Sequence, residues 1–390
     1  MTIPRSFRIT FHRIIFSRLG LLVSLIGAVV LLGNAISGQE FKEVHPGVEH
    51  AAVEHRIGTE PVKINLLRLD LSKVRLDVKL GMDTVVGAET TSSIARRHRA
   101  VAAINSGFFR LDSSIFAGDP AGALKIDGEV LSEPDRDRSV IFIDNRRDRT
   151  LVEFVHLRTK RTFEIRGREF NVDGINRERR DNELVVFTPA FHRTTLTGPD
   201  GVEAIVRNGR ITAILNGVGS LVIPADGLVL SASGTARNEM MRTLRIGDRV
   251  RMFAAVQPVG DDVLPPAIFN YEDHTNGVSM LVKDGAKSLT WEVERAPKSF
   301  AESRHPRTAV AKLKDGRVLL VTVDGRQPGV SVGMTLPELA DYLLTVGAVD
   351  AINLDGGGST TMVLDGRVVN TPSDPNGERK VGDAIVVTLR

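Results

Sequence analysis

The chain has 390 residues and a mass of 42.5 kDa, with 42% hydrophobic and 25% charged residues, a composition typical of a globular protein with two or three domains. Its 51 Lys and Arg residues stand against 48 Asp and Glu residues, and it contains no Cys. The weak charge balance disfavours a nucleic-acid-binding protein. The lack of Cys excludes disulfides, thiolate metal sites, iron–sulfur clusters and a cysteine nucleophile.

Residues 1–37 have the features of an export signal. Four arginines precede the apolar run from Leu19 to Leu32, and small residues at Ala35 and Ser37 suit a cleavage site before Gly38. The run is shorter than the ~20 residues that span a bilayer. We expect a signal peptide or an uncleaved N-terminal membrane anchor here, and therefore a periplasmic or extracellular protein. Without this segment, 47 basic residues face 48 acidic ones, so the pI of 9.2 reflects the leader.

The rest of the chain is rich in predicted strands and poor in helices. Apolar residues alternate from Val74 to Leu80, which predicts a strand with one buried face, and Thr90 to Arg99 predicts a short helix. Asp-Gly dipeptides, typical of hairpin turns, recur at 127–128, 173–174, 226–227, 315–316, 324–325 and 365–366. The prediction is an α+β fold with a β-rich mixed sheet and few helices.

One helix near the C-terminus is well specified. Thr335 to Glu338 has the spacing of a capping box, an apolar stripe follows, and Gly347 suits the end of the helix. A strand from Ala348 to Asp355 comes next, so we expect a C-terminal strand–helix–strand unit.

Four segments are predicted along the chain. After the leader at residues 1–37, residues 38–145 form the N-terminal part of a main domain. Residues 146–290 form a β-rich inserted module, marked by Gly-Pro and Pro-Ala-Asp-Gly turns and little helical periodicity, and residues 291–390 form the C-terminal part of the main domain.

The segment from Asn353 to Ser359 carries the strongest chemical signal. Alternation along the preceding strand places Asn353 and Asp355 on the same face, so two polar side chains emerge together at its end. Three consecutive glycines, Gly356, Gly357 and Gly358, allow close backbone approach and offer clustered N–H donors for an anion or a sugar oxygen. The alternative interpretation is a glycine bulge at a crowded corner of a sheet.

Two predicted hairpins add partners for this segment. A two-residue turn at Asp315-Gly316 would place Arg307 directly opposite Asp324, either as a structural ion pair or to orient Arg307 toward a phosphate or carboxylate. A turn at Asp365-Gly366 would set Thr361 opposite Asn370, near the glycine run.

Further polar residues stand at other predicted ends of strands. Asn105-Ser106-Gly107-Phe108-Phe109 follows a strand and could wall a sugar site, although two adjacent Phe residues also suit a core. Glu338 fits the capping box better than a role as a catalytic acid. The histidines show no metal-ligand spacing, and no serine-hydrolase, zinc-protease, P-loop or dinucleotide motif occurs.

Taken together, the C-terminal motifs resemble those of the phosphodiester glycosidase family. They occur in the family's order, with Asn105 to Phe109 resembling an upstream family stretch in which Ser106 replaces the usual small residue. The motifs of the C-terminal third are Arg307-Thr308-Ala309, Val323-Asp324-Gly325-Arg326, Gly333-Met334-Thr335, Glu338-Leu339-Ala340, Asn353-Leu354-Asp355-Gly356-Gly357-Gly358-Ser359 and Pro372-Ser373-Asp374. The resemblance spans roughly residues 100–390 and is thin across the predicted module.

The resemblance implies hydrolysis of a sugar-1-phosphodiester at its anomeric bond, in an enzyme of the kind often associated with exopolysaccharide in bacteria. We expect an exported glycoside hydrolase that acts on such a phosphodiester or on a related glycan linkage. An oxocarbenium-like transition state needs a carboxylate, for which Asp355 is the candidate, with Asp324 or Glu338 as a second. The departing phosphate needs positive charge, for which Arg307 and Arg326 are the candidates. The remaining candidates bind phosphate or sugar oxygens, namely Gly356, Gly357, Gly358, Ser359, Asn353, Asn105 and Asn370.

Two other functions stay open at this stage. One is a non-catalytic polysaccharide-binding or export-associated protein that keeps the pocket. The other is a metal-dependent phosphodiesterase that breaks the P–O bond, for which Asp324, Asp355 and Asp374 leave room for a divalent cation. No cofactor or metal site is predicted, a divalent cation stays open, and the expected partner is a glycan or glycosyl phosphodiester rather than a nucleic acid. The oligomeric state is left undecided.

Overall fold

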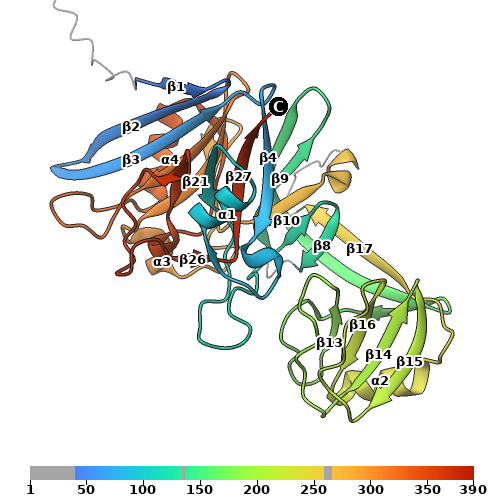
Figure 1. Ribbon diagram of the computed structural model, residues 1–390. Coiled ribbons are helices and arrows are strands. Elements are labelled where there is room, and N and C mark those ends of the chain that lie inside the picture. Colours follow the sequence, from blue (N-terminus) through green and yellow to red (C-terminus); the bar gives the residue numbers. More distant parts are fainter. Residues whose placement is uncertain (1–39, 134–136, 259–265) are drawn as a thin grey trace, which may run out of the picture. The chain divides into compact units, whose positions relative to one another are not determined.

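Alternating apolar residues and short turns build five β-sheets in the computed structural model, which describes residues 40–133, 137–258 and 266–390 (Figure 1). The predicted leader at residues 1–37 lies outside the described residues. Every strand pairing in the described part of the chain is antiparallel except that of β12 with β13. The predicted β-rich α+β class is confirmed.

The largest sheet has eight strands and carries the glycine run at the end of one of them. In order across the sheet its strands are β1 (Lys42–His45), β2 (Val48–Ile57), β3 (Glu60–Leu69), β22 (Val318–Val323), β21 (Arg307–Leu313), β23 (Ala348–Asn353), β19 (Met280–Lys283) and β20 (Ala286–Lys287). Alternation gives this sheet two apolar faces: Ile352 packs in one core cluster and its neighbour Ala351 in another.

Each face of the eight-stranded sheet has its own covering layer. Helix α4 (Leu336–Thr345) covers one face through Leu336, Leu339 and Leu343. A five-stranded sheet shares the core of the other face through β4 and β27. Its strands, in order, are β25 (Arg367–Val368), β24 (Met362–Leu364), β6 (Ala102–Asn105), β27 (Asp383–Leu389) and β4 (Val74–Leu80).

A third sheet lies next to these two sheets and includes two long strands, β10 (Thr150–Ile165) and β17 (Arg251–Pro258). Its order is β11 (Arg168–Asn171), β10, β9 (Arg138–Asn145), β18 (Asp273–Asn276), β7 (Leu124–Ile126) and β8 (Glu129–Ser132), with β17 also paired to β10. Figure 1 shows β10 and β17 leading toward the elements drawn in yellow-green.

Those elements form a five-stranded sheet with a core of its own. Its strands, in order, are β12 (Gly174–Ile175), β13 (Leu184–Phe187), β16 (Gly227–Ala232), β14 (Val202–Arg207) and β15 (Arg210–Asn216), and α2 (Gly234–Thr243) packs on it through Met240. Within the predicted 146–290 module, β18 and β19 pair with β9 and β23 outside it. The module and its boundaries stay a prediction.

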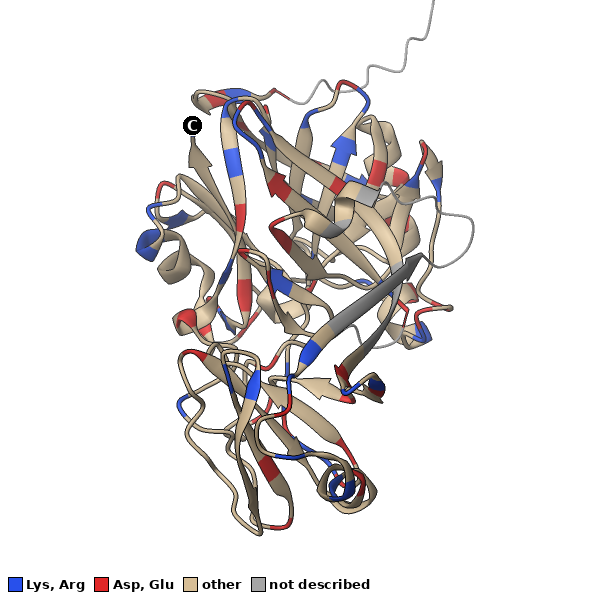
Figure 2. Ribbon diagram, turned by 90° about the vertical axis from the view of Figure 1, so that its right-hand side faces the viewer, with Lys and Arg blue, Asp and Glu red and all other residues tan. Residues whose placement is uncertain are grey.

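The remaining elements are short. They are β5 (Glu89–Thr90) paired with β26 (Lys380–Val381), α1 (Thr91–Arg97), α3 (Lys298–Glu302) and the 3₁₀ turns Gly81–Asp83, Pro266–Asn270 and Gly357–Ser359. No helix among residues 40–133, 137–258 and 266–390 has both the length and the apolar character to cross a membrane. Basic and acidic residues are both scattered over the described strands and loops, in keeping with the near-neutral charge balance (Figure 2).

The local predictions from sequence are largely confirmed. The strand from Val74 to Leu80 has the predicted alternation of buried and half-buried residues, and α1 lies inside the predicted 90–99 segment. Helix α4 begins at the Thr335 capping box, and Gly347 follows it with φ of +88°. The Asp-Gly dipeptides at 127–128 and 365–366 form two-residue turns with positive φ at both residues.

Candidate active site

Asp355 lies in the loop that follows β23, at an edge where three sheets meet. The Asp355 N–H donates to the Ser106 carbonyl at 2.9 Å, and Asn105 Nδ2 donates to the Asp355 carbonyl at 2.6 Å. The flanking Leu354 is fully buried in the core, whereas Asp355 is half-buried. The backbone of Asp355 is thus fixed from both sides, and the residue as a whole is only partly covered.

The carboxyl of Asp355 has a raised affinity for protons. Burial raises its pKa to about 6, and the negative charge of Asp383 acts in the same direction. The Ser359 hydroxyl, the Gly356 N–H at 2.9 Å and the positive charge of Arg379 oppose the shift. A carboxyl that titrates near neutral pH can hold or release a proton under mild conditions, which suits acid–base or nucleophilic chemistry.

The three glycines allow arginine side chains to lie against the loop. A Cβ at Gly358 would lie 2.3 Å from Arg379 Nη2, and a Cβ at Gly357 would lie 3.0 Å from Arg326 Nη2. Contacts this short exclude a side chain without displacement of the guanidinium. The predicted close approach therefore occurs, and its partners are two cations.

Most of the predicted N–H donors of the loop are occupied. Gly356 N–H donates to Asp355 Oδ1, Gly357 N–H to the Pro306 carbonyl at 2.9 Å, and Ser359 N–H to the Gly356 carbonyl at 3.1 Å. The contacts of Gly356, Gly357, Gly358 and Ser359 with a substrate stay predictions.

Arg326 and Arg379 differ in how they are neutralised. Arg379 Nε pairs with Asp374 Oδ2 at 2.8 Å. Arg326 is exposed, lies 3.4 Å from His305 Nδ1 through Nη2, and forms no ion pair with the described residues. Burial and the charges of Arg307 and Arg326 lower the pKa of His305, so this ring favours its neutral form. Arg326 thus keeps its charge for a further partner.

The predicted register that places Arg307 opposite Asp324 is wrong by one position. Arg307 pairs with Val323, because residues 314–316 form a three-residue loop in which Gly316 has φ of +87°. Leu313 and Arg317 close this loop through a 2.8 Å backbone hydrogen bond. The two-residue turn expected at Asp315-Gly316 does not form.

Arg307 is almost fully buried and binds backbone carbonyls. Its Nε donates to Met334 O at 2.8 Å, and Nη2 donates to Phe300 O at 2.7 Å and Ser303 O at 3.0 Å. Burial and the charge of Arg326 lower its pKa to about 10. These bonds fix the end of α3 and the turn before α4, and the role of Arg307 in phosphate binding stays a prediction.

Asp324 and Asn370 hold two loops together beside the glycine run. Asp324 accepts hydrogen bonds from Asn370 Nδ2 at 3.0 Å and from Thr371 N–H at 3.1 Å. Asn370 also donates to Thr360 O and accepts from Met362 N–H. The register around the 365–366 turn is the predicted one, because Val363 pairs with Val368.

Glu338 has the structural contacts of a capping box. It accepts the Thr335 N–H at 2.9 Å, and its own N–H donates to Thr335 Oγ1 at 3.1 Å. Arg304 also binds both carboxylate oxygens, at 3.1 Å and 3.2 Å from its Nε. These contacts lower the pKa of Glu338. The catalytic roles of Asp324 and Glu338 stay predictions.

Asn105 and Asn353 flank Asp355 from neighbouring strands. Asn105 Oδ1 accepts from Thr308 Oγ1 at 2.7 Å and from Thr361 N–H at 3.0 Å, so it joins β6, β21 and the end of the glycine run. Asn353 Nδ2 donates to Val278 O and Leu354 O. Asn353 Oδ1 is buried without a hydrogen-bond partner among the described residues.

A second buried carboxyl, Asp383 at the start of β27, had no signal in the sequence. Its Oδ1 accepts the Gly107 N–H and its Oδ2 accepts Thr275 Oγ1, both at 2.8 Å. Ser106 Oγ lies 3.2 Å from Thr275 Oγ1 and links this network to the segment that holds Asp355. Burial raises the pKa of Asp383 to about 6. Arg379 was also missed.

We name the assembly of Asp355, Gly356–Ser359, Arg326, Arg379 and Asp383 the glycine-loop centre. Of the predicted site residues, the structure brings Asp355, the glycines, Ser359 and Arg326 together here, with Asn105, Asn353 and Asn370 as supports. In the described part of the chain no three His, Asp or Glu side chains are grouped as metal ligands would be. A carboxyl of raised pKa near guanidinium groups, with a second carboxyl of raised pKa acting on it through its charge, is suited to reactions at a carbon that bears an anionic leaving group.

Comparisons with known proteins bear on the same part of the chain. The family model described as phosphodiester glycosidase matches residues 200–388, just under half of the chain. N-acetylglucosamine-1-phosphodiester alpha-N-acetylglucosaminidase of Mus musculus is 31% identical over 181 residues, which are 44% of this chain and 33% of that relative. The chain therefore matches about a third of the length of this curated relative.

Two solved structures have a similar fold. A hypothetical protein from Synechocystis has a TM-score of 0.77 at 22% identity, covering 90% of this chain and 64% of that chain. A putative exported protein from Burkholderia pseudomallei has a TM-score of 0.70 at 25% identity, covering 84% of this chain and 74% of that chain. The family match spans Arg326, Asp355, Arg379 and Asp383, and the resemblance of this chain to the phosphodiester glycosidase family is thereby confirmed over residues 200–388.

Proposed function

We propose that the protein is an exported glycosidase that hydrolyses a sugar-1-phosphodiester, breaking the bond between the anomeric carbon and the phosphate oxygen. The observation that carries the proposal is the position of the half-buried Asp355 carboxyl next to a glycine loop on which two guanidinium groups lie. The resemblance to the phosphodiester glycosidase family supports the same reaction. Export rests on the pattern of residues 1–37 alone.

In this proposal the departing phosphate is stabilised by positive charge and does not need to be protonated. When the C–O bond breaks, its electron pair stays on a phosphate oxygen, and the resulting phosphomonoester is stable as an anion. Arg326, which has no ion pair among the described residues, and Arg379 would bind these phosphate oxygens. A guanidinium binds phosphate through two parallel N–H donors, so it both orients and stabilises the departing group.

Asp355 would act on the sugar side of the bond. The anomeric carbon gains positive character as the phosphate departs, and an ionised carboxylate stabilises it, attacks it or takes a proton from the attacking water. Water supplies the hydroxyl that completes the sugar product, and its remaining proton is released. Asp383 raises the pKa of Asp355 and is placed to act as a second carboxyl through its charge.

The test is product analysis with a panel of synthetic sugar-1-phosphodiesters in water enriched in heavy oxygen. Anomeric cleavage gives the free sugar and a phosphomonoester that carries no heavy oxygen. Cleavage at phosphorus gives a labelled phosphate or a sugar-1-phosphate, and this result would replace the proposal with a phosphodiesterase. A chelator arm is included, because a metal-dependent phosphodiesterase loses activity with it. Tight binding of the panel without any turnover would favour the non-catalytic glycan-binding alternative.

A further inference from the structure

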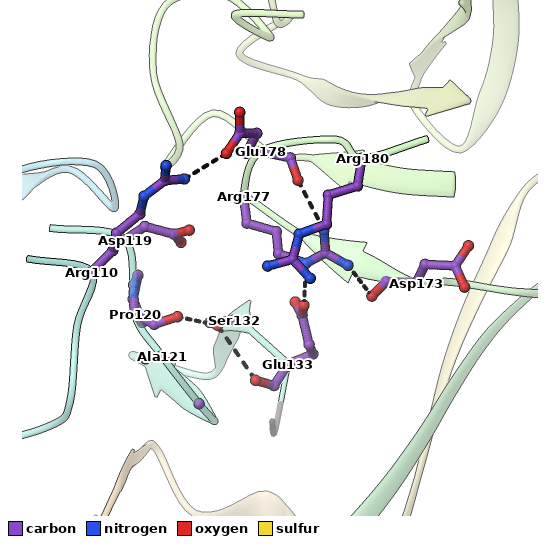
Figure 3. Close-up of a pocket in the computed structure, with 11 residues that line it drawn as sticks. Arg110, Asp119, Pro120, Ala121, Ser132, Glu133, Asp173, Arg177, Glu178 and Arg180 are labelled. Atoms are coloured by element: carbon purple, nitrogen blue, oxygen red, sulfur yellow. Dashed lines mark hydrogen bonds and ion pairs between the residues drawn. The ribbon is translucent and has the colours of Figure 1, made fainter. Parts of the chain in front are cut away.

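A large polar cavity lies outside the glycine-loop centre. It has a volume of about 690 Å³ and lies between the segment that follows β6 and the segment that joins β12 to β13 (Figure 3). Its lining residues are Arg110, Asp119, Pro120, Ala121, Gly122, Ser132, Glu133, Asp173, Arg177, Glu178 and Arg180. This volume is in the range of small-molecule sites, which is ≈300–1,000 Å³. We name it the Arg110–Arg177 cavity.

Two of the three lining arginines, Arg110 and Arg177, are held in place before any ligand arrives. Arg177 Nε pairs with Glu133 at 2.6 Å, and its Nη1 pairs with Glu183 at 2.6 Å. Arg110 Nη1 pairs with Glu178 at 2.6 Å. Figure 3 shows Arg110 and Arg177 on opposite sides of the cavity, each joined to an acidic partner. Because these side chains are already ordered, a ligand would not have to immobilise them.

Asp119 is the lining group whose hydrogen bonding is incomplete. Its side chain is 8% exposed, and Oδ1 is buried without a hydrogen-bond partner among the described residues. In Figure 3 its carboxyl points into the space between Arg110 and Arg177. A buried polar atom without a partner is costly, so the position favours a ligand that supplies one. Burial and the charge of Glu133 raise its pKa to about 8, against the charges of Arg177, Arg110 and Arg180.

The balance of groups in the cavity points to one class of ligand. Among the described residues, three arginines and four acidic side chains line it, and two of the arginines are paired with glutamates, so the lining offers no excess of positive charge to an anion. An apolar ligand would cover charged groups without bonding them, and none of the described lining residues is aromatic, so a planar ligand finds no ring to stack on among them. Hydroxyl groups donate and accept, so a neutral sugar can pair with both signs of group at once.

The cavity is connected to the glycine-loop centre through short backbone links. Ala121 N–H donates to Phe108 O at 2.8 Å, and Phe108 N–H donates to Asn276 Oδ1 at 3.2 Å. The next residue along the chain, Gly107, donates to Asp383. The segment from Asn105 to Gly122 thus contributes both to the supports of Asp355 and to the wall of the cavity.

We propose that the Arg110–Arg177 cavity binds a neutral, polyhydroxylated sugar unit, with the unpartnered Asp119 carboxyl as a direct contact. As a second subsite for the substrate, the assignment rests on the proposed glycosidase function. As a sugar-binding site, it stands by itself. The Arg180 guanidinium is exposed, forms no ion pair among the described residues, and completes the rim.

The test measures binding of free sugars that contain no phosphodiester, so its outcome does not depend on turnover. The probes are neutral hexose and N-acetylhexosamine di- and trisaccharides, with a glucuronic acid disaccharide and inorganic phosphate as anionic comparisons. Saturation-transfer NMR and calorimetry with the whole chain would detect binding. We expect at least one neutral sugar to bind in the millimolar range or tighter, and the anions to bind more weakly.

Matched variants connect that binding to the cavity. Asp119→Leu keeps the branched shape of the side chain, is somewhat larger and removes both oxygens, and we expect binding to weaken about tenfold or more, the effect of losing a single good hydrogen bond. Asp119→Asn keeps a donor and an acceptor and should bind nearly as the parent does. Arg180→Ala, at an exposed position that does not threaten folding, should weaken binding several-fold. Arg207→Ala, whose exposed side chain pairs with Asp226 away from the cavity, should have no effect.

Three results would overturn the inference. They are no binding of any neutral sugar, preferential binding of phosphate or the glucuronic acid disaccharide, and unchanged neutral-sugar affinity in both Asp119→Leu and Arg180→Ala. Binding that behaves as expected in a protein that cleaves no phosphodiester would keep the sugar site and remove the proposed reaction. Turnover of a phosphodiester without sugar binding at the cavity would keep the proposed reaction and remove the sugar site.

Discussion

The glycine-loop centre and the Arg110–Arg177 cavity both combine arginine and aspartate side chains, but they differ in which of these side chains have partners. In the cavity, Arg110 and Arg177 are each neutralised by glutamates, and the aspartate is left without a hydrogen bond on one oxygen. In the glycine-loop centre, neutral donors satisfy the carboxyl of Asp383, and Arg326 keeps its charge.

This difference indicates what each region can bind. An unpaired guanidinium next to a carboxyl of raised pKa suits a ligand that carries negative charge and reacts. A lining of paired charges is suited to holding hydroxyl groups without reaction. The predictions that follow are ordered by expected effect, and each would either separate the two regions or show that the distinction is false.

The largest effect is expected for Asp355→Asn. The amide keeps the size of the carboxyl but cannot stabilise positive charge, attack carbon or accept a proton, so kcat should fall about 10²–10⁴-fold, the usual range for such a group. Substrate affinity should change little. Steady-state and single-turnover kinetics on a sugar-1-phosphodiester measure both quantities. Asp350→Asn is the control: Asp350 lies on β23, before the loop of Asp355, pairs with Lys283 at 3.9 Å and accepts the Asp284 N–H at 3.3 Å. Equal rates in the two variants would place the reaction elsewhere.

A smaller effect, mainly on KM, is expected for the two arginines of the glycine loop. Losing a charged hydrogen bond to phosphate weakens binding by about 10- to 100-fold, so Arg326→Ala should raise KM by this amount. Arg379→Ala should raise it less, because that guanidinium is already shared with Asp374. Arg367→Ala, on exposed β25, is the control. The affinity of a neutral sugar that contains no phosphate, measured as a competitor, should not change in either variant. If its affinity fell as much as that of the substrate, the two regions would be a single binding site.

The order of these effects also shows what could be read from the sequence. Helix α4, β4 and the 365–366 turn follow from local patterns, because capping, alternation and Asp-Gly turns act between residues close in the chain. Asp355 and the glycines were found because their spacing is unusual. Arg326 was found through the family resemblance.

The errors and omissions have physical causes. A single additional residue in the loop before Arg317 changes the partner of Arg307 from Asp324 to Val323, and no local pattern separates a two-residue from a three-residue loop there. Asp383 and Arg379 reach the centre only because β27 pairs with β6, a contact across more than half of the chain. The Arg110–Arg177 cavity likewise joins segments far apart in sequence. Such contacts depend on topology rather than on local spacing.

A change in pH dependence is expected for Asp383→Asn. Its amide oxygen can still accept the Gly107 N–H, and the Thr275 hydroxyl can turn to accept from the amide, so the network survives. The negative charge that raises the pKa of Asp355 is removed, so the pKa of Asp355 should fall. If Asp355 acts ionised, kcat/KM rises with pH through about 6 in the parent, and this rise should move to lower pH by less than about one unit. An unmoved midpoint would show that the two carboxyls do not interact.

The smallest effect, on stability, is expected in the other region, for Asp119→Asn. The pKa of Asp119 is raised from 3.8 to about 8 in the folded protein, so folding favours its protonated form. The stability that this proton provides is complete below about pH 4, falls as pH rises, and is lost above about pH 8. The amide does not titrate, so the variant should match the parent near pH 4 and exceed it at pH 9 by on the order of 2 kcal/mol, or several degrees in Tm. Thermal unfolding across this range, with Asp226→Asn on exposed surface as control, measures the difference. If the Tm of the parent changed with pH as that of Asp119→Asn does, the pKa of Asp119 would not be raised in solution, and the carboxyl of the cavity would lose the property that sets it apart in this comparison.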